Sequence, residues 1–443
     1  MSSILIKNAT MVNEGATLVT DLWIKNGHIE KIANDIQPKE NCREINAGGL
    51  CLLPGIIDDQ VHFREPGLTH KATIATEARA AVAGGVTSFM EMPNTKPPAL
   101  TQDLLEQKFD IAAATSVANY SFMMGVSNDN ADEVLRTNDK KKDVAAIKIF
   151  MGSSTGNMLV DNYITLTKIF SESELLIATH CEDERIIKAN KEKYPDPTDA
   201  SFHPLIRDVE ACFESSFAAV QLAKKHDTRL HVFHISTAKE LQLFSNMLPL
   251  SEKRITAEVC VHHLHFTADD YARLGNLIKC NPAIKAPENK AALWEGLLDD
   301  RLDIIATDHA PHTWEEKQQP YIEAPAGLPL VQHSLLLMLK YVKEGKLSLE
   351  KVVEKMCHAP ATCFQLKDRG YIREGYHADL VLVEMDTLTT VTKENILYKC
   401  GWSPLENEVF PATVRYTLVN GEVVYEDGKI NDSVRGQRLR FDR

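Results

Sequence analysis

Short apolar runs, rich in β-branched residues, alternate with alanine-rich stretches through the middle of the chain. Most of these runs are spaced by about 30 residues, the length of a strand–helix–strand unit. Between the first two runs, residues 73–83 favour a helix, which Gly84 and Gly85 end. The runs predict eight strands at residues 56–62, 86–92, 120–126, 144–150, 175–180, 230–235, 255–260 and 302–308. Apolar strands that alternate with helices predict an α/β fold with a parallel sheet, and eight of them predict a closed (β/α)8, TIM-like barrel. An open doubly wound sheet is the alternative.

Both ends of the chain show a different pattern, in which strand-like segments are joined by tight turns. Asn26-Gly27 and Asn420-Gly421 are hairpin signals, because both central residues of a type I′ turn need a positive φ. The flanking segments predict strands at residues 4–7, 21–25, 29–33, 379–384, 412–419 and 422–425. We therefore predict a small β-sandwich domain built from residues 1–53 and 366–443, with the barrel occupying residues 54–365.

Composition narrows the class of protein. The 443 residues suffice for a barrel and a small second domain. A net charge of -13 argues against a nucleic-acid or anionic-membrane partner, and no apolar run approaches the roughly 20 residues of a membrane span. The nine cysteines are scattered without a CxxC pair, as is typical of reduced thiols. Since the sequence also opens without a signal-like segment, we expect a cytoplasmic protein.

Polar residues stand in or at the ends of five predicted strands. They are His62, Lys148, His180, His234 and Asp308. Taken singly, each has a structural explanation, such as a helix cap or a buried ion pair. In a barrel, however, the carboxyl ends of the strands meet at one mouth. Imidazole and carboxylate are the usual ligands of zinc-like ions, so the five together predict a metal site.

Longer motifs follow one another in order along nearly the whole chain. They are residues 53–58 (LPGIID), 62–67 (HFREPG), 92–95 (MPNT), 281–282 (NP), 308–312 (DHAPH) and 370–380, which contains GYI and ADL. In kind and order these motifs resemble the amidohydrolase superfamily and, within it, the dihydroorotase family. The resemblance implies reversible ring closure of N-carbamoyl-L-aspartate to dihydroorotate in de novo pyrimidine (UMP) biosynthesis.

The resemblance also implies roles for individual residues. His62, Gln60 and Asp308 would face a first zinc ion, His180 and His234 would hold a second, and Lys148, carboxylated on its side-chain nitrogen, would bridge the two. Asp308 would also be the general base and acid that moves a proton from metal-bound hydroxide to the leaving ring nitrogen. The substrate-binding residues would be Arg64, Asn94, Asn281, His312, Ala326 and Gly327.

Arg64 and Gln60 bear most directly on function. Arg64 offers a planar cation for the substrate carboxylate, and its structural alternative is an ion pair with Glu65. The family's first strand normally ends in His-x-His, but Gln60 puts a weaker zinc donor in place of the first histidine. The site would then hold one or two zinc ions.

Three further expectations concern alternative functions, the assembly of the protein, and a run of histidines near the predicted site. The second functional alternative is a hydantoinase, dihydropyrimidinase or allantoinase-type cyclic amidase, whose substrates would leave Arg64 without a carboxylate to bind. The third alternative is a non-catalytic partner of aspartate transcarbamoylase. We expect a homodimer as the default assembly. His262, His263 and His265 are expected to be structural, because side chains alternate along a strand and cannot all converge.

Overall fold

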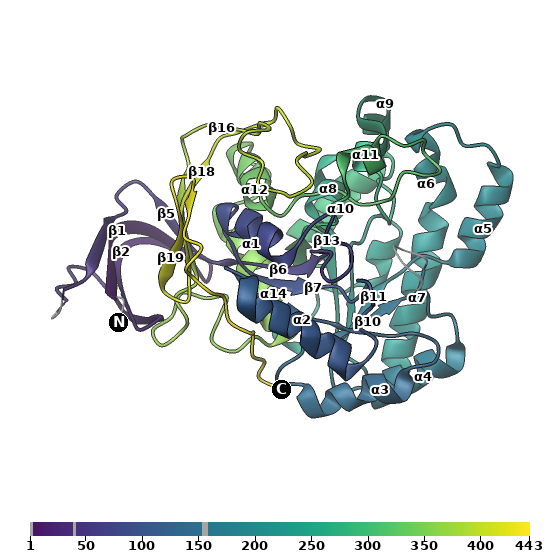
Figure 1. Cartoon of the computed structure of the whole chain (residues 1–443), viewed down its shortest axis with the longest axis horizontal. Coiled ribbons are helices and arrows are strands. Elements are labelled where there is room, and N and C mark those ends of the chain that lie inside the picture. The colour runs from purple at the N-terminus through teal and green to yellow at the C-terminus, as the bar shows by residue number, and fades with distance from the viewer. Residues whose placement is uncertain (1–2, 39–40, 153–157) are drawn as a thin grey trace.

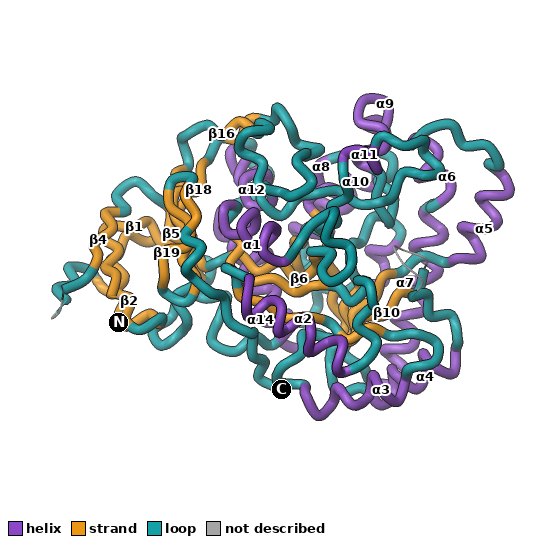
Figure 2. Tube along the Cα trace, in the orientation of Figure 1, coloured by secondary structure: helices purple, strands orange, loops and turns teal. Residues whose placement is uncertain are grey.

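The computed structural model describes residues 3–38, 41–152 and 158–443 of the chain. It consists of a strand barrel surrounded by helices and, beside it, a β domain that contains segments from both ends of the chain (Figure 1). In Figure 2 the barrel strands lie inside the ring of helices. Among the described residues 3–38, 41–152 and 158–443, no helix is long and apolar enough to cross a membrane.

The barrel contains all eight predicted strands. They are β6 (Ile56–Val61), β7 (Val86–Glu91), β8 (Asn119–Phe122) with β9 (Met124–Gly125), β10 (Ile147–Phe150), β11 (Ile177–His180), β12 (Leu230–Val232), β13 (Ile255–Cys260) and β14 (Ile304–Ala306). Neighbouring strands pair in parallel. A parallel bridge between Val61 and His309 joins the last strand to the first. The sheet therefore closes, and the open doubly wound alternative is wrong.

Helices follow the barrel strands and cover them from outside. The longer ones are α1 (Ile74–Ala83), α2 (Gln102–Thr115), α4 (Tyr163–Glu172), α5 (Glu184–Lys193), α7 (Val209–His226), α10 (Pro287–Leu298) and α12 (Ser334–Lys343). The helix α1 confirms the prediction for residues 73–83, because Thr73 caps its start and Gly84 ends it. A Cβ atom on Gly84 would lie 2.3 Å from the Gln332 carbonyl oxygen, so only glycine fits this close approach.

One nine-stranded sheet joins the two ends of the chain. Its strands are β1 (Ser3–Asn13), β2 (Ala16–Lys25), β3 (His28–Ala33), β4 (Arg43–Asn46), β5 (Cys51–Pro54), β15 (Leu380–Glu384), β18 (Thr413–Val419), β19 (Glu422–Glu426) and β20 (Lys429–Ile430). The strand β5 pairs with β1 on one side and with β15 on the other. A single β domain is therefore built from both termini, as predicted, while the boundaries at residues 53 and 365 stay predictions.

The two predicted hairpin turns lie against each other. Asn26 and Gly27 have φ angles of 52° and 85°, and Asn420 and Gly421 have 50° and 77°. A Cβ atom on Gly27 would lie 2.9 Å from the Asn420 oxygen, and one on Gly421 would lie 2.7 Å from the Gly27 Cα atom. Both glycines are therefore needed for the turn and for the contact between the two ends of the chain.

Candidate active site

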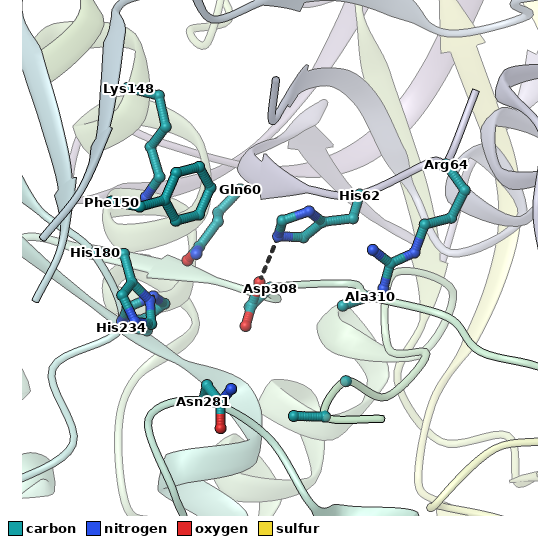
Figure 3. A pocket seen from close by; sticks show the side chains of 12 residues that line it. Gln60, His62, Arg64, Lys148, Phe150, His180, His234, Asn281, Asp308 and Ala310 are labelled. Atoms are coloured by element: carbon teal, nitrogen blue, oxygen red, sulfur yellow. Dashed lines mark hydrogen bonds and ion pairs between the residues drawn. The ribbon is translucent and has the colours of Figure 1, made fainter. Parts of the chain in front are cut away.

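The carboxyl ends of the barrel strands surround a pocket that brings the predicted site residues together (Figure 3). Its lining residues are Gln60, His62, Arg64, Lys148, Phe150, His180, His234, Asn281, Asp308, Ala310, Ala326 and Gly327. Ten of these twelve are predicted site residues, and only Phe150 and Ala310 were not expected. The remaining two predicted residues, Asn94 and His312, contact His62 and Arg64.

Three of the pocket residues have a left-handed backbone. The φ angles are 68° at Arg64, 41° at His234 and 47° at Asp308. A side chain other than glycine is strained by about 1–3 kcal/mol in this region, and such strain is concentrated at functional sites. Each of the three follows a barrel strand, so the strained residue redirects the chain at the mouth.

His62 connects the first strand to the aspartate after the last. Its Nε2 atom lies 3.1 Å from Asp308 Oδ1, and its Nδ1 atom lies 2.8 Å from Asn94 Oδ1 (Figure 3 draws the first contact). Burial would raise the pKa of Asp308, but the hydrogen bond and charge of His62 outweigh it and lower that pKa. Burial also lowers the pKa of His62. Near neutral pH the pair is therefore a carboxylate beside a neutral imidazole.

His180 and His234 lie close together at one side of the pocket, where their side chains overlap in Figure 3. The His180 Nδ1 atom lies 2.9 Å from His234 Nε2. Burial lowers the pKa of both rings, and the mutual proximity of the rings adds to this for His234. The His180 Nε2 atom lies 3.1 Å from Glu182, a carboxylate that orients the ring. Two neutral imidazoles with adjacent lone pairs suit a divalent metal ion.

Lys148 is buried in β10, and among the described residues its Nζ atom has no hydrogen-bond partner. The atom lies 4.8 Å from the Phe150 ring centre and 4.0 Å from that of Phe233. Burial lowers its pKa from 10.5 to about 7. A large fraction of this amine is therefore neutral and nucleophilic near neutral pH, which is unusual for lysine.

Gln60 does line the pocket, but its amide oxygen is in contact with the thiol at the end of β13. The Oε1 atom lies 3.6 Å from Cys260 Sγ. Both ring nitrogens of its neighbour His62 already contact side-chain oxygens. The predicted first metal position is thus poorer in available donors than the predicted position at His180 and His234.

A buried acid pair lies beneath the pocket. The His231 Nε2 atom lies 3.2 Å from Glu258 and 3.5 Å from Asp59. Burial raises the pKa of Glu258 to about 8, although a hydrogen bond with Asp59 lowers it in part. Burial also raises the pKa of Asp59 well above its usual value, and the charge of Glu258 adds to this rise. Glu258 accepts a hydrogen bond from the His234 backbone at 3.2 Å. The cluster therefore helps to position His234.

Arg64 is a buried cation held by neutral groups. Its Nε atom donates to the Pro311 carbonyl at 3.0 Å, and its Nη2 atom lies 3.1 Å from His312 Nε2. Only 2% of the residue is exposed, and burial lowers its pKa to about 10. Glu65 is not its partner, because the Glu65 carboxylate accepts from the Ile74 backbone instead. The expected structural alternative for Arg64 is therefore wrong.

His312 links the Arg64 guanidinium to the loop that contains Ala326. Its Nε2 atom also lies 2.9 Å from the Ala326 carbonyl, and its Nδ1 atom lies 2.9 Å from Lys71 Nζ. Burial and the Arg64 charge lower the His312 pKa well below its usual value, so the ring is neutral. Sequence reasoning did not find Lys71, which has no motif or strand-end position to mark it.

Two buried lysines hold the backbone around Ala326 and Gly327. Lys317 Nζ donates to the carbonyls of Pro325 and Gly327 at 2.9 and 2.8 Å. Lys279 Nζ donates to the carbonyls of Tyr321 and Ala324 at 2.6 and 2.5 Å. The loop edge is therefore fixed before any ligand binds.

Asn281 reaches the pocket from the segment after α9 (Tyr271–Leu274). Its Oδ1 atom lies 2.9 Å from His203 Nε2, which fixes the amide. His309, the neighbour of Asp308, has a structural contact, because its Nε2 atom lies 2.8 Å from Glu77. His265 also lies outside the pocket, with Nδ1 2.8 Å from the Tyr341 hydroxyl.

The sequence places this barrel and its site in a known family. A model of the amidohydrolase family matches residues 51–424. Because the match covers the barrel and more than half of the chain, the chain belongs to the amidohydrolase family.

Curated relatives cover nearly the whole chain. A protein named dihydroorotase from Halobacterium salinarum is 34% identical over 394 residues, which are 88% of this chain and 89% of the relative. Another from Pyrococcus abyssi is 33% identical over 425 residues, or 96% of each chain.

Solved structures of related enzymes share the fold. The L-hydantoinase (dihydropyrimidinase) of Arthrobacter aurescens has a TM-score of 0.92 at 28% identity and covers 97% of this chain and 98% of its own. The dihydropyrimidinase of Brevibacillus agri has a TM-score of 0.89 at 24% identity over the full length of both chains. These neighbours confirm the barrel and terminal β domain.

Proposed function

We propose that the protein is a metal-dependent dihydroorotase, which interconverts dihydroorotate and N-carbamoyl-L-aspartate in de novo pyrimidine biosynthesis. The relatives named dihydroorotase support the reaction at the level of sequence. The observation that carries the proposal is the buried Arg64 guanidinium in a pocket with Lys148 and Asp308.

Arg64 selects the substrate class. A buried cation without a carboxylate partner is unfavourable unless a ligand supplies the negative charge. Dihydroorotate carries a carboxylate on the carbon beside a ring nitrogen, and the acyclic N-carbamoyl-aspartate keeps that carboxylate on its α-carbon, whereas hydantoin and dihydrouracil have no carboxylate. A hydantoinase-type activity is the second candidate function, and it rests on the fold that this chain shares with the L-hydantoinase structure.

The remaining substrate contacts come from the loop edge and its neighbours. Asn281 offers an amide that donates to a ring carbonyl, and the fixed backbone at Ala326 and Gly327 offers a donor and an acceptor to the ring edge. His312 is neutral and can hydrogen-bond the carboxylate beside Arg64. Asn94 orients His62 through its 2.8 Å contact with Nδ1.

Asp308 is the group that moves the proton. Its carboxylate is ionised near neutral pH, because its pKa is lowered, so it can accept a proton during hydrolysis. The same oxygen then delivers that proton to the ring nitrogen as the amide bond breaks. In ring closure, the proton moves in the opposite direction.

We propose zinc as the metal, held mainly by His180, His234 and carboxylated Lys148, with Asp308 beside them. A bound zinc ion would polarise the ring carbonyl and lower the pKa of a water molecule. The neutral Lys148 amine supports carboxylation: its lone pair attacks the carbon of CO2, a new N–C bond forms, one proton is released, and an anionic carbamate results. That anion would replace an unpaired buried ammonium with a metal ligand.

Gln60 favours one firmly held catalytic ion. Its amide oxygen is a weaker donor than imidazole and is already in contact with Cys260. His62 and Asp308 would then hold a second ion only weakly.

Turnover by the purified, zinc-loaded protein tests this function. We expect hydrolysis of L-dihydroorotate at high pH and ring closure of N-carbamoyl-L-aspartate at low pH, with at least about a 100-fold loss in Asp308→Asn. If zinc-loaded protein shows no turnover of either compound, the proposal is wrong.

Two features of assembly stay predictions. They are the homodimer and an association with aspartate transcarbamoylase. Co-elution with that enzyme in size-exclusion chromatography, without turnover, would support a non-catalytic partner instead.

A further inference from the structure

A cluster of potential metal ligands lies outside the set assigned above. One ligand atom from each of Cys260, His262 and His263 lies within 4.8 Å of the others. All three residues are buried, with at most 3% of any of them exposed. None of the three is needed for the proposed reaction.

The local fold brings the three side chains together. Cys260 is the last residue of β13, and the short helix α8 (Val261–His265) begins directly after it. Along a strand, His262 and His263 would point to opposite faces. In the helical turn their rings lie 4.2 Å apart between centres. The expectation that strand alternation separates this run is therefore wrong for these two residues, although His265 does diverge.

The ring nitrogens of the cluster carry unused lone pairs. His263 Nε2 lies 3.1 Å from the Pro282 carbonyl, to which it can only donate, so its Nδ1 atom keeps a lone pair. In the described part of the chain, His263 Nδ1 has no hydrogen-bond partner. One ring nitrogen of His262 lies beside the Thr307 backbone carbonyl, to which it can only donate, so the other ring nitrogen keeps its lone pair. Buried polar atoms are rarely left unpaired, so these nitrogens point to a missing ligand.

The third member adds a soft donor. Cys260 Sγ has only long contacts, 3.6 Å to Gln60 Oε1 and 3.9 Å to Glu258 Oε1. A thiolate with two imidazoles is a donor set that zinc prefers in proteins. The neighbouring Glu258 carboxyl can balance part of the remaining positive charge. The contact with Gln60, a pocket-lining residue, places the cluster next to the pocket.

We propose that Cys260, His262 and His263 bind a zinc ion, separate from the catalytic ion at His180 and His234. On binding, the Cys260 thiol releases its proton to solvent and its sulfur becomes a ligand, while water fills the fourth position. The second ring nitrogen of His263 holds Pro282, the residue after Asn281. The ion would therefore tie the end of β13 to the segment that positions Asn281.

X-ray absorption at the zinc edge tests this site without reference to activity, because none of the proposed catalytic ligands is sulfur. We expect zinc-loaded wild-type protein to show a sulfur neighbour at about 2.3 Å. Cys260→Ser should lose that signal and one zinc ion per chain. Cys357→Ser is the matched control, because Cys357 is equally buried but lies against the Pro54 carbonyl, away from the cluster. It should retain both the signal and the ion.

Two further measurements keep the test decisive. His262→Gln should also lose one zinc ion and should weaken the sulfur signal, so the proposal does not depend on the folding of Cys260→Ser alone. Absence of sulfur around zinc in wild-type protein overturns the site. Turnover of dihydroorotate by the same samples is recorded separately: activity without a sulfur signal contradicts only this inference, and a sulfur signal without activity contradicts only the proposed function.

Discussion

The Oε1 atom of Gln60 lies 3.6 Å from the Sγ atom of Cys260, although the two residues are 200 positions apart in the chain. The contact joins the end of the first barrel strand to the end of β13. The contact involves the side chain of Gln60, the residue at the first position of the His-x-His pattern that the family resemblance predicts. Because Gln60 is a weaker zinc donor than histidine, we expect it to affect how many metal ions the proposed site holds. The histidines predicted for the second metal position, His180 and His234, are both present.

Gln60→His should raise the zinc content by about one ion per chain above that of the wild type, because imidazole is a better zinc donor than an amide oxygen. Metal analysis after dialysis measures this, with Gln221→His on the exposed face of α7 as the control. Unchanged zinc content in Gln60→His would show that the first position is not limited by this residue.

Arg64→Met should lower kcat/KM for dihydroorotate by about 10- to 150-fold, which corresponds to the ~1.5–3 kcal/mol of a charged hydrogen bond. Any activity toward neutral hydantoin should change far less, since hydantoin has no carboxylate. Arg79→Met is the control, because Arg79 lies on the solvent side of α1 and pairs with Asp432. An equal loss for both substrates would assign Arg64 a structural role.

Lys148→Met should change the pH dependence of stability in metal-free, CO2-free protein. Burial lowers the Lys148 pKa from 10.5 in the unfolded chain to about 7 in the folded protein. Between about pH 7 and pH 10.5, the unfolded chain therefore binds a proton at Lys148 that the folded chain does not. The free energy of unfolding therefore rises with pH across this window, and the wild type should be steeper than Lys148→Met by about 1.4 kcal/mol per pH unit.

Denaturant titrations at several pH values measure that slope. Lys188→Met is the control, because Lys188 is exposed on α5, and its slope should equal that of the wild type. Parallel slopes for wild type and Lys148→Met would mean that the buried lysine keeps its ordinary pKa.

Gly327→Ala should impair turnover more than stability. At Gly327 the φ angle is 138°, and a Cβ atom would lie 2.4 Å from the Ala310 oxygen and 2.9 Å from His312 Nε2. Gly345 also has a positive φ, 76°, but nothing lies within 4 Å of its Cβ position. Gly345→Ala should lose about 1 kcal/mol of stability, and Gly327→Ala should lose more, because the Ala310 carbonyl must shift to admit the Cβ atom. Only Gly327→Ala should also lose about tenfold or more in kcat/KM, because the loop edge must move. Equal kcat/KM in the two variants would contradict a role for this edge in binding.

Much of the fold could be predicted because its signals are local. The barrel strands are buried on both faces, so they appear as mostly apolar runs, and polar residues such as His180 and Asp308 mark where these runs end at the mouth. The turns at Asn26 and Asn420 could be predicted because the required φ angles are positive. The contact between those turns could not, since it depends on the packing of both ends of the chain.

The residues that sequence reasoning missed lack such local signals. Phe150 lines the pocket, but an apolar side chain in a strand is indistinguishable from core. Lys71 reaches His312 across 241 positions of sequence. The proximity of His262 and His263 could not be predicted, because the helix α8 begins directly after the strand ends and the side-chain period changes there.

The ratio of kcat/KM for L-dihydroorotate to that for dihydrouracil tests the central claim most directly, because the two rings differ only in the carboxylate that Arg64 is proposed to bind. We predict that the zinc-loaded wild-type enzyme prefers dihydroorotate by at least about 100-fold. A ratio near one, or a preference for dihydrouracil, would contradict the assignment and identify a hydantoinase-type enzyme instead.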